Sequence, residues 1–119
     1  MRNSKSFKSE FNNKVLVLES DDALSFLLVT SIELQGYRAS TDFCESPAVI
    51  ILDAGEDGNS LIKCRQLKEK YPTSKIIMTS VVHDKERILS QGADLYLPKP
   101  YNIVSLMQWV NVFAKEFNN

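Results

Sequence analysis

The sequence has little of several residue types that mark particular classes of protein. It contains two cysteines and one histidine in 119 residues, and Cys44 and Cys64 do not fit a metal-ligand spacing. We therefore expect neither a structural zinc site nor a disulfide framework, and both cysteines should be reduced, as in a cytoplasmic protein. The four glycines form no phosphate-binding loop, which argues against a nucleotide-binding protein.

Excess charge and long apolar segments are missing as well. Fourteen basic residues are balanced by fifteen acidic ones, so no basic stripe points to nucleic acid. No apolar run approaches the length of a membrane span, and residues 1–13 lack the apolar core of a signal peptide. We expect residues 1–13 to be a flexible tail and residues 14–119 to be one domain. It should be cytoplasmic, with no nucleic-acid or membrane partner.

What the sequence does contain is an alternation of short apolar runs and amphipathic segments. Four runs are short and apolar enough for strands buried on both faces: residues 15–18, 48–52, 75–78 and 95–97. Four other segments have apolar residues at helical spacing: residues 22–35, 59–70, 84–91 and 103–117. This alternation predicts an α/β protein whose parallel sheet carries helices on both faces.

Polar and charged residues stand where the predicted strands end. They are Glu19, Ser20, Asp21, Asp53, Thr79, Ser80 and Lys99. Because the carboxyl ends of parallel strands meet at one edge of a sheet, we expect these side chains to converge on one small cleft.

In this order, the segments resemble the receiver domain of two-component response regulators over residues 14–117. The most specific part is LPKPYNIVSL (97–106), which is similar to the family's Lys-Pro-aromatic turn before its last helix. GADLYL (92–97) and KEKYPTSKIIMTS (68–80) are also similar in spacing and residue type. The resemblance implies a flavodoxin-like three-layer fold, with about five parallel strands in the order 2-1-3-4-5.

The resemblance also implies a role for each residue of the cleft. Asp53 matches the phosphoacceptor, Lys99 the lysine that binds a phosphoryl oxygen, and Ser80, with Thr79 as its alternate, the hydroxyl beside them. A magnesium ion would be held by an acid-rich set of ligands: Glu19, Asp53, the Gly55 backbone carbonyl and, as a further candidate, Asp21. Tyr96 matches the family's switch aromatic.

The implied function is phosphorelay signalling. A histidine kinase or a histidine phosphotransfer protein would donate the phosphoryl group, and the chain itself would be no enzyme beyond weak autophosphatase activity. The signal would pass through altered binding to a downstream protein. A homodimer would use the face of residues 84–91, 95–97 and 103–117.

Three departures from the family pattern bear on activity. Ser20 stands where the family has a second acid, so magnesium binding should be weakened. The loop after Asp53 is shortened. Only residues 42–47 separate a further strand, expected at residues 37–41, from the run at 48–52, so the family's second helix is missing. Any apolar surface that this loss leaves must be covered by a loop, by the tail or by another chain.

Simpler interpretations remain for each residue. Asp53 could cap a turn, Lys99 could be a surface lysine, and acids such as Glu19 and Asp21 are favoured at a helix start in any case. Ser80 and Tyr96 could be purely structural. The alternative function is therefore a phosphorylation-independent pseudo-receiver that acts as a protein-binding module. A flavodoxin-like flavin carrier has less support, because no loop rich in Ser, Thr and Gly follows the first strand.

Overall fold

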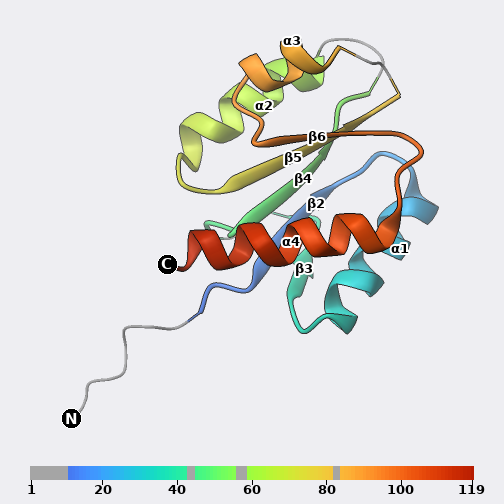
Figure 1. Cartoon of the computed structure of the whole chain (residues 1–119), viewed down its shortest axis with the longest axis vertical. Coiled ribbons are helices and arrows are strands. Elements are labelled where there is room, and N and C mark those ends of the chain that lie inside the picture. Colours follow the sequence, from blue (N-terminus) through green and yellow to red (C-terminus); the bar gives the residue numbers. More distant parts are fainter. Residues whose placement is uncertain (1–10, 43–44, 56–58, 82–83) are drawn as a thin grey trace.

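A computed structural model describes residues 11–42, 45–55, 59–81 and 84–119, so Cys44 lies outside the described residues (Figure 1). These ranges contain five strands and four helices. In chain order they are β2 (Lys14–Leu18), α1 (Asp22–Leu34), β3 (Arg38–Ser40), β4 (Val49–Asp53), α2 (Asn59–Lys70), β5 (Lys75–Ser80), α3 (Lys85–Ser90), β6 (Leu95–Pro98) and α4 (Ile103–Phe117). None of the described helices is both long and apolar enough to cross a membrane.

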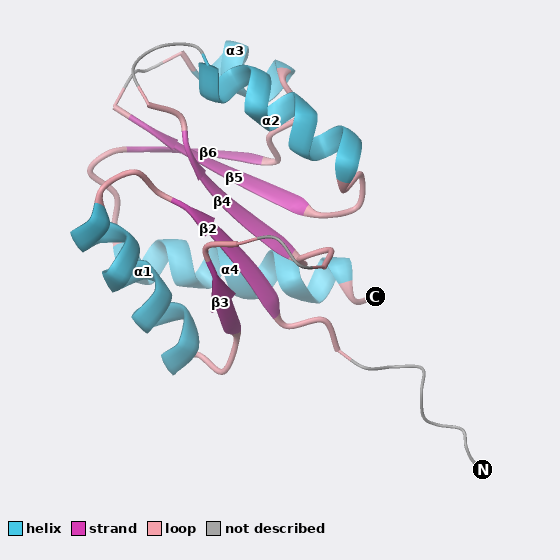
Figure 2. Cartoon of the chain, turned by 180° about the vertical axis from the view of Figure 1, so that it is seen from behind, coloured by secondary structure: helices cyan, strands magenta, loops and turns pink. Residues whose placement is uncertain are grey.

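The five strands form one sheet in the order β3-β2-β4-β5-β6, and every neighbouring pair is parallel. Helices α1 and α4 cover one face of the sheet, and α2 and α3 cover the other (Figures 1 and 2). Numbered along the chain, the strands have the order 2-1-3-4-5. The predicted flavodoxin-like three-layer fold is confirmed.

The strands are continuously apolar because both faces of the sheet are covered. Alternate residues of the central strands point to opposite layers: Val49 and Ile51 pack toward α1 and α4, while Ile50 and Leu52 pack toward α2. All four are at most 2% exposed. A one-residue slip in strand register would exchange these two sets, so the packing fixes which side chains reach the carboxyl edge.

The connection between β3 and β4 contains no helix in its described residues, 41–42 and 45–48, as the sequence predicts. Strand β3 is three residues long and pairs in parallel with β2, with Arg38 opposite Lys14 and Ser40 opposite Leu16. On the side that has lost a helix, β3 therefore presents Arg38 and Ser40, which are polar, while Ala39 packs into the opposite layer. Polar side chains replace much of the apolar surface that a helix would have covered.

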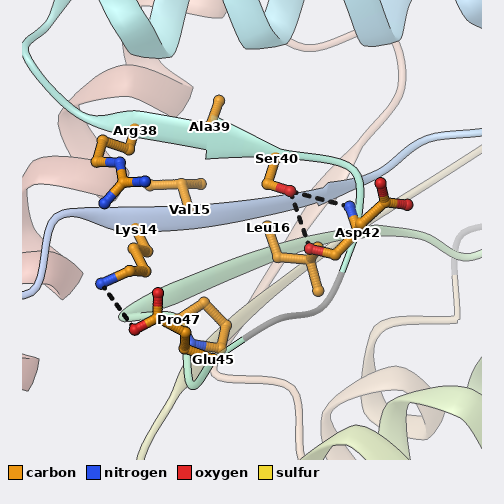
Figure 3. A pocket seen from close by; sticks show the side chains of 9 residues that line it. All are labelled: Lys14, Val15, Leu16, Arg38, Ala39, Ser40, Asp42, Glu45 and Pro47. Atoms are coloured by element: carbon orange, nitrogen blue, oxygen red, sulfur yellow. Dashed lines mark hydrogen bonds and ion pairs between the residues drawn. The ribbon is translucent and has the colours of Figure 1, made fainter.

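A small groove of about 120 Å³ marks the place of the missing helix (Figure 3). Pro47 and Glu45 of the connecting segment line its lower side, and Lys14 forms an ion pair with Glu45 at 3.4 Å. Leu16, on the groove's floor, is only 2% exposed. The short connection itself thus shields the apolar residue beneath it.

The described end of the predicted tail lies against the domain. The Asn12 backbone N–H donates to Asn118 Oδ1 at 2.6 Å, and the Asn118 side-chain amide donates back to the Asn12 carbonyl at 2.9 Å. The Asn12 side-chain amide also donates to the Ser46 carbonyl at 2.9 Å. These bonds join the segment before β2 to the end of α4 and to the β3–β4 connection.

Ser74 is expected to anchor the short β3–β4 connection. Its fully buried hydroxyl donates to the Pro47 carbonyl just before β4. Replacing Ser74 with Ala leaves that carbonyl without its partner, so we predict a loss of about 1–3 kcal/mol in the free energy of unfolding. Urea unfolding measures it, with Ser90→Ala as the control, because the exposed Ser90 hydroxyl bonds to Arg87 within its own helix. Equal stability of the two variants would contradict the prediction.

Candidate functional site

The site centres on a lysine that lies between two carboxylates. Lys99 Nζ is 3.1 Å from Glu19 Oε1 and 3.2 Å from Asp53 Oδ1. Glu19 follows β2, Asp53 ends β4, and Lys99 follows β6, so β5 lies between the strand of Asp53 and the strand of Lys99. The long lysine stem spans that distance, and the Lys99 backbone N–H is fixed to the Ser80 carbonyl at 2.7 Å. The three side chains are 1%, 11% and 18% exposed for Glu19, Asp53 and Lys99.

Asp53 receives two further hydrogen bonds. The Ser20 hydroxyl donates to Asp53 Oδ2 at 2.7 Å, and the Gly55 backbone N–H donates to Oδ1 at 3.2 Å. Gly55 has φ +70°, a left-handed conformation that a glycine adopts without strain and that turns its N–H back toward the carboxylate. Ser20 thus bonds directly to the predicted acceptor.

The electrostatics of the pair favour the charged forms of both groups. Burial raises the pKa of Asp53, but the hydrogen bonds from Ser20, Gly55 and Lys99 outweigh it and hold the pKa below its ordinary value. Burial lowers the pKa of Lys99, but the bonds to Glu19 and Asp53 outweigh it and hold the pKa above its ordinary value. At neutral pH the Asp53 carboxylate is therefore ionised, as a nucleophilic oxygen must be.

Thr79 and Ser80 lie at the end of β5, next to Asp53, and both are buried. Thr79 stands opposite Asp53 in the strand register, its carbonyl accepts the Ala54 N–H at 2.7 Å, and its hydroxyl has no hydrogen-bond partner among the described residues. The structure therefore brings both candidate hydroxyls to the strand end next to the acceptor's strand.

Asp21 and Tyr96 take other positions. Asp21 Oδ1 accepts the Leu24 N–H at 2.9 Å and so caps the start of α1, while the neighbouring Asp22 lines the cleft. Tyr96 is half-buried on β6 and packs against the core layer of α2 and α3. Its proposed switching remains a prediction.

Several residues of the cleft were not singled out from the sequence. Besides the predicted residues, the cleft of about 500 Å³ is lined by polar side chains: Asp22, Ser25, Thr41, Ser60 and Lys63. The signal that could have found Ser60 and Lys63 is the shortened loop after Asp53, because it starts α2 close to the site.

Tyr101, two positions after Lys99, is a further residue near the two carboxylates. Its hydroxyl is buried and has no hydrogen-bond partner in the described part of the chain. Burial, together with the charges of Glu19 and Asp53, raises the pKa of Tyr101 to about 12. The phenol therefore stays protonated and lies within the field of both carboxylates.

The donor set fits a magnesium ion that keeps much of its water. Within the described residues no three His, Cys, Asp or Glu side chains lie together as a metal-binding group. Glu19 and Asp53 supply two carboxylates, and Glu19 Oε1 is buried without a well-directed hydrogen bond. Magnesium is commonly bound through one or two carboxylates and several waters, so these ligands suit it, but weakly.

A scan against models of known protein families gave no match. The phosphate regulon transcriptional regulatory protein PhoB of Rhizobium meliloti (strain 1021) is 32% identical over 86% of this chain and 52% of its own length. The receiver domain of the Francisella response regulator 1452 is 26% identical, with a TM-score of 0.78, over 88% of this chain and 98% of that one.

The chain has the fold of a response regulator receiver domain, and curated relatives of similar sequence are response regulators. A response regulator protein from Burkholderia pseudomallei, whose crystal structure contains a phosphorylated aspartic acid, a calcium ion and citrate, shares the fold. It is 21% identical with a TM-score of 0.71, over 87% of this chain and 69% of that one. This receiver domain spans about half the length of the curated relatives it matches.

We expect Lys99 to stabilise the folded protein at this edge of the sheet. Lys99→Met leaves two mostly buried carboxylates without their cation, so we predict a loss of about 2–4 kcal/mol in the free energy of unfolding near neutral pH. The loss should shrink in acid, because protonation of Asp53 removes the repulsion between the two carboxylates. Urea unfolding at several pH values measures this, with Lys115→Met on α4 as the control. A pH-independent loss no larger than that of the control would contradict it.

Proposed function

We propose that the protein works in two-component signalling by accepting a phosphoryl group on Asp53. The observation that carries this proposal is the Asp53 carboxylate itself. It is ionised, partly exposed to an open cleft, and held in place by Lys99, Ser20 and the Gly55 N–H. An aspartate that merely capped a turn would not require a lysine carried from β6 across the neighbouring strand.

The proposed reaction needs positioning more than acid–base help. A carboxylate oxygen of Asp53 attacks the phosphorus of a phosphohistidine, the nitrogen–phosphorus bond breaks as the oxygen–phosphorus bond forms, and the imidazole leaves and takes up a proton from solvent. Lys99 neutralises negative charge on the transferred group while remaining near Glu19. The Ser80 and Thr79 hydroxyls at the end of β5 are the proposed donors to a phosphoryl oxygen.

We further propose magnesium as the metal, held by Glu19, Asp53 and the Gly55 backbone carbonyl with water in its other positions. When bound, the ion would add positive charge beside the phosphoryl oxygens. The calcium ion and phosphorylated aspartic acid in the Burkholderia regulator support a divalent metal in this fold. Ser20, which is neutral and donates its proton to Asp53, would leave this metal site weaker than one with a further acid.

The proposed phosphodonor is a histidine kinase or a histidine phosphotransfer protein in the cytoplasm. An apolar hollow beside Lys99 suits a helix of such a partner, and it is lined by Leu24, Leu27, Val81, Pro100, Tyr101 and Ile103. The proposed output is binding to a downstream protein, with a homodimer through the face of α3, β6 and α4. Trp109, Val104 and Val112 are exposed on α4 and favour such a contact.

The phosphorylation-independent alternative is not favoured, because the relatives are named as response regulators and transcriptional regulatory proteins. Those relatives are about twice as long as the matched region. That this chain itself binds no nucleic acid remains a prediction from its balanced charge.

Beryllofluoride, which mimics a phosphoryl group on a carboxylate, tests the proposed acceptor. With magnesium present, we expect saturable amide NMR shifts around β4 and a change in the fluorescence of Trp109. Asp53→Asn should abolish both, because the amide cannot bind the probe as a carboxylate does. Asp42→Asn is the matched control, since Asp42 lines the groove beside β3 and not the cleft. A wild-type protein that does not respond at high magnesium would overturn the proposal.

Ser20→Asp tests the weakened metal site. Adding a carboxylate next to Asp53 should raise magnesium affinity by about tenfold, as followed by NMR titration with magnesium alone. The same variant should be less stable without metal, because three carboxylates then share Lys99. Ser20→Ala is the control, because it removes the hydroxyl without adding a ligand, and its magnesium affinity should not rise. No gain in Ser20→Asp would show that position 20 does not face the metal.

A further inference from the structure

The first turns of α2 form part of the wall of the cleft. Ser60 and Lys63 line the cleft together with Asp53, Glu19 and Ser20. Helix α2 begins at Asn59, six positions after Asp53, so little chain separates the acceptor from the helix. Ser60 and Lys63 are three residues apart in the helix and therefore lie on the same side of it, which explains why both face the cleft.

The charge within this cleft is unevenly distributed. Glu19, Asp22 and Asp53 supply three carboxylates to its lining, and Lys99 is engaged by Glu19 and Asp53 from its edge. Lys63 makes no hydrogen bond or ion pair with any described residue, although it lines the same space. Its ammonium is therefore not committed to a structural partner within the described chain.

A phosphoryl group on Asp53 would increase the need for positive charge. Such a group brings additional negative charge and several strong acceptor oxygens to the cleft. Lys99 can neutralise only part of this charge. A metal held by two carboxylates beside a neutral Ser20 binds more weakly than one held by a fuller acidic set, so it occupies the site less often. The side of the cleft facing α2 is where a second cation is present.

We propose that Lys63 is the second cation of the phosphoryl site and takes over part of the charge neutralisation that Ser20 removes from the metal. This inference rests on the proposed phosphoacceptor role of Asp53. Lys63 pairs with a phosphoryl oxygen from the α2 side, and Lys99 does so from the β6 side. The site is thereby less dependent on magnesium than one with an acid at position 20.

Beryllofluoride binding by wild type and by Lys63→Gln tests this directly. We expect the glutamine variant to bind the probe about five- to tenfold more weakly at fixed magnesium, because a charge-assisted contact is lost from a partly solvated site. Lys63→Arg should retain most of the affinity. Lys70→Gln is the matched control, since Lys70 is on the same helix but does not line the cleft, and it should bind like wild type.

A double-mutant cycle with Ser20→Asp tests the link to the metal. If Ser20→Asp strengthens metal binding, Lys63→Gln should lower the affinity for beryllofluoride by a smaller factor in the Ser20→Asp background than in the wild-type background. A wild type that responds to beryllofluoride while Lys63→Gln binds equally well overturns the role of Lys63 and leaves the acceptor role of Asp53 standing. An equal effect in both backgrounds overturns its link to the metal. A wild type that does not respond at all overturns the proposed function itself.

Discussion

The interaction on which the carboxyl edge of the sheet depends is the contact of Lys99 with both Glu19 and Asp53. Two carboxylates at the ends of neighbouring strands repel each other, and their burial makes that repulsion stronger. One lysine relieves it for both. Lys99 reaches both because it follows β6, which lies two strands from β4 in the sheet. A hydrogen bond from its backbone N–H to the Ser80 carbonyl holds it in place. The strand order is therefore what lets three distant parts of the sequence share one charge.

Much of this arrangement follows from sequence because it is set by periodicity. The apolar runs fixed where strands lie, and the parallel order made their last residues neighbours, so the convergence of Glu19, Asp53 and Lys99 could be predicted. The position of Asp21 could not. Asp21 and Asp22 are both acids at a helix start, where either is favourable. Only the structure shows that Asp21 caps α1 while Asp22 faces the cleft.

The loss of a helix between β3 and β4 is a second case in which the sequence predicted only part of the structure. Counting residues predicted the loss, because a short connection cannot hold a helix as well as return along the sheet. It could not predict how the face would be completed. Arg38 stands opposite Lys14, an arrangement that costs free energy when like charges face each other, and Glu45 relieves it by pairing with Lys14. The solution combines polar residues on the edge strand with a connection that shields Leu16.

Ser20 connects the resting site to its proposed chemistry. A third carboxylate at this position would add repulsion around Lys99 in the absence of metal, whereas the serine hydroxyl donates to Asp53 and stabilises its ionised form. A hydroxyl can also turn to donate to a phosphoryl oxygen, so the serine need not oppose the modified state. Compared with an acid at this position, the serine offers no carboxylate to a metal ion. In the proposed site, the balance between protein cations and metal would therefore shift toward the protein, with the side chain at position 20 setting it.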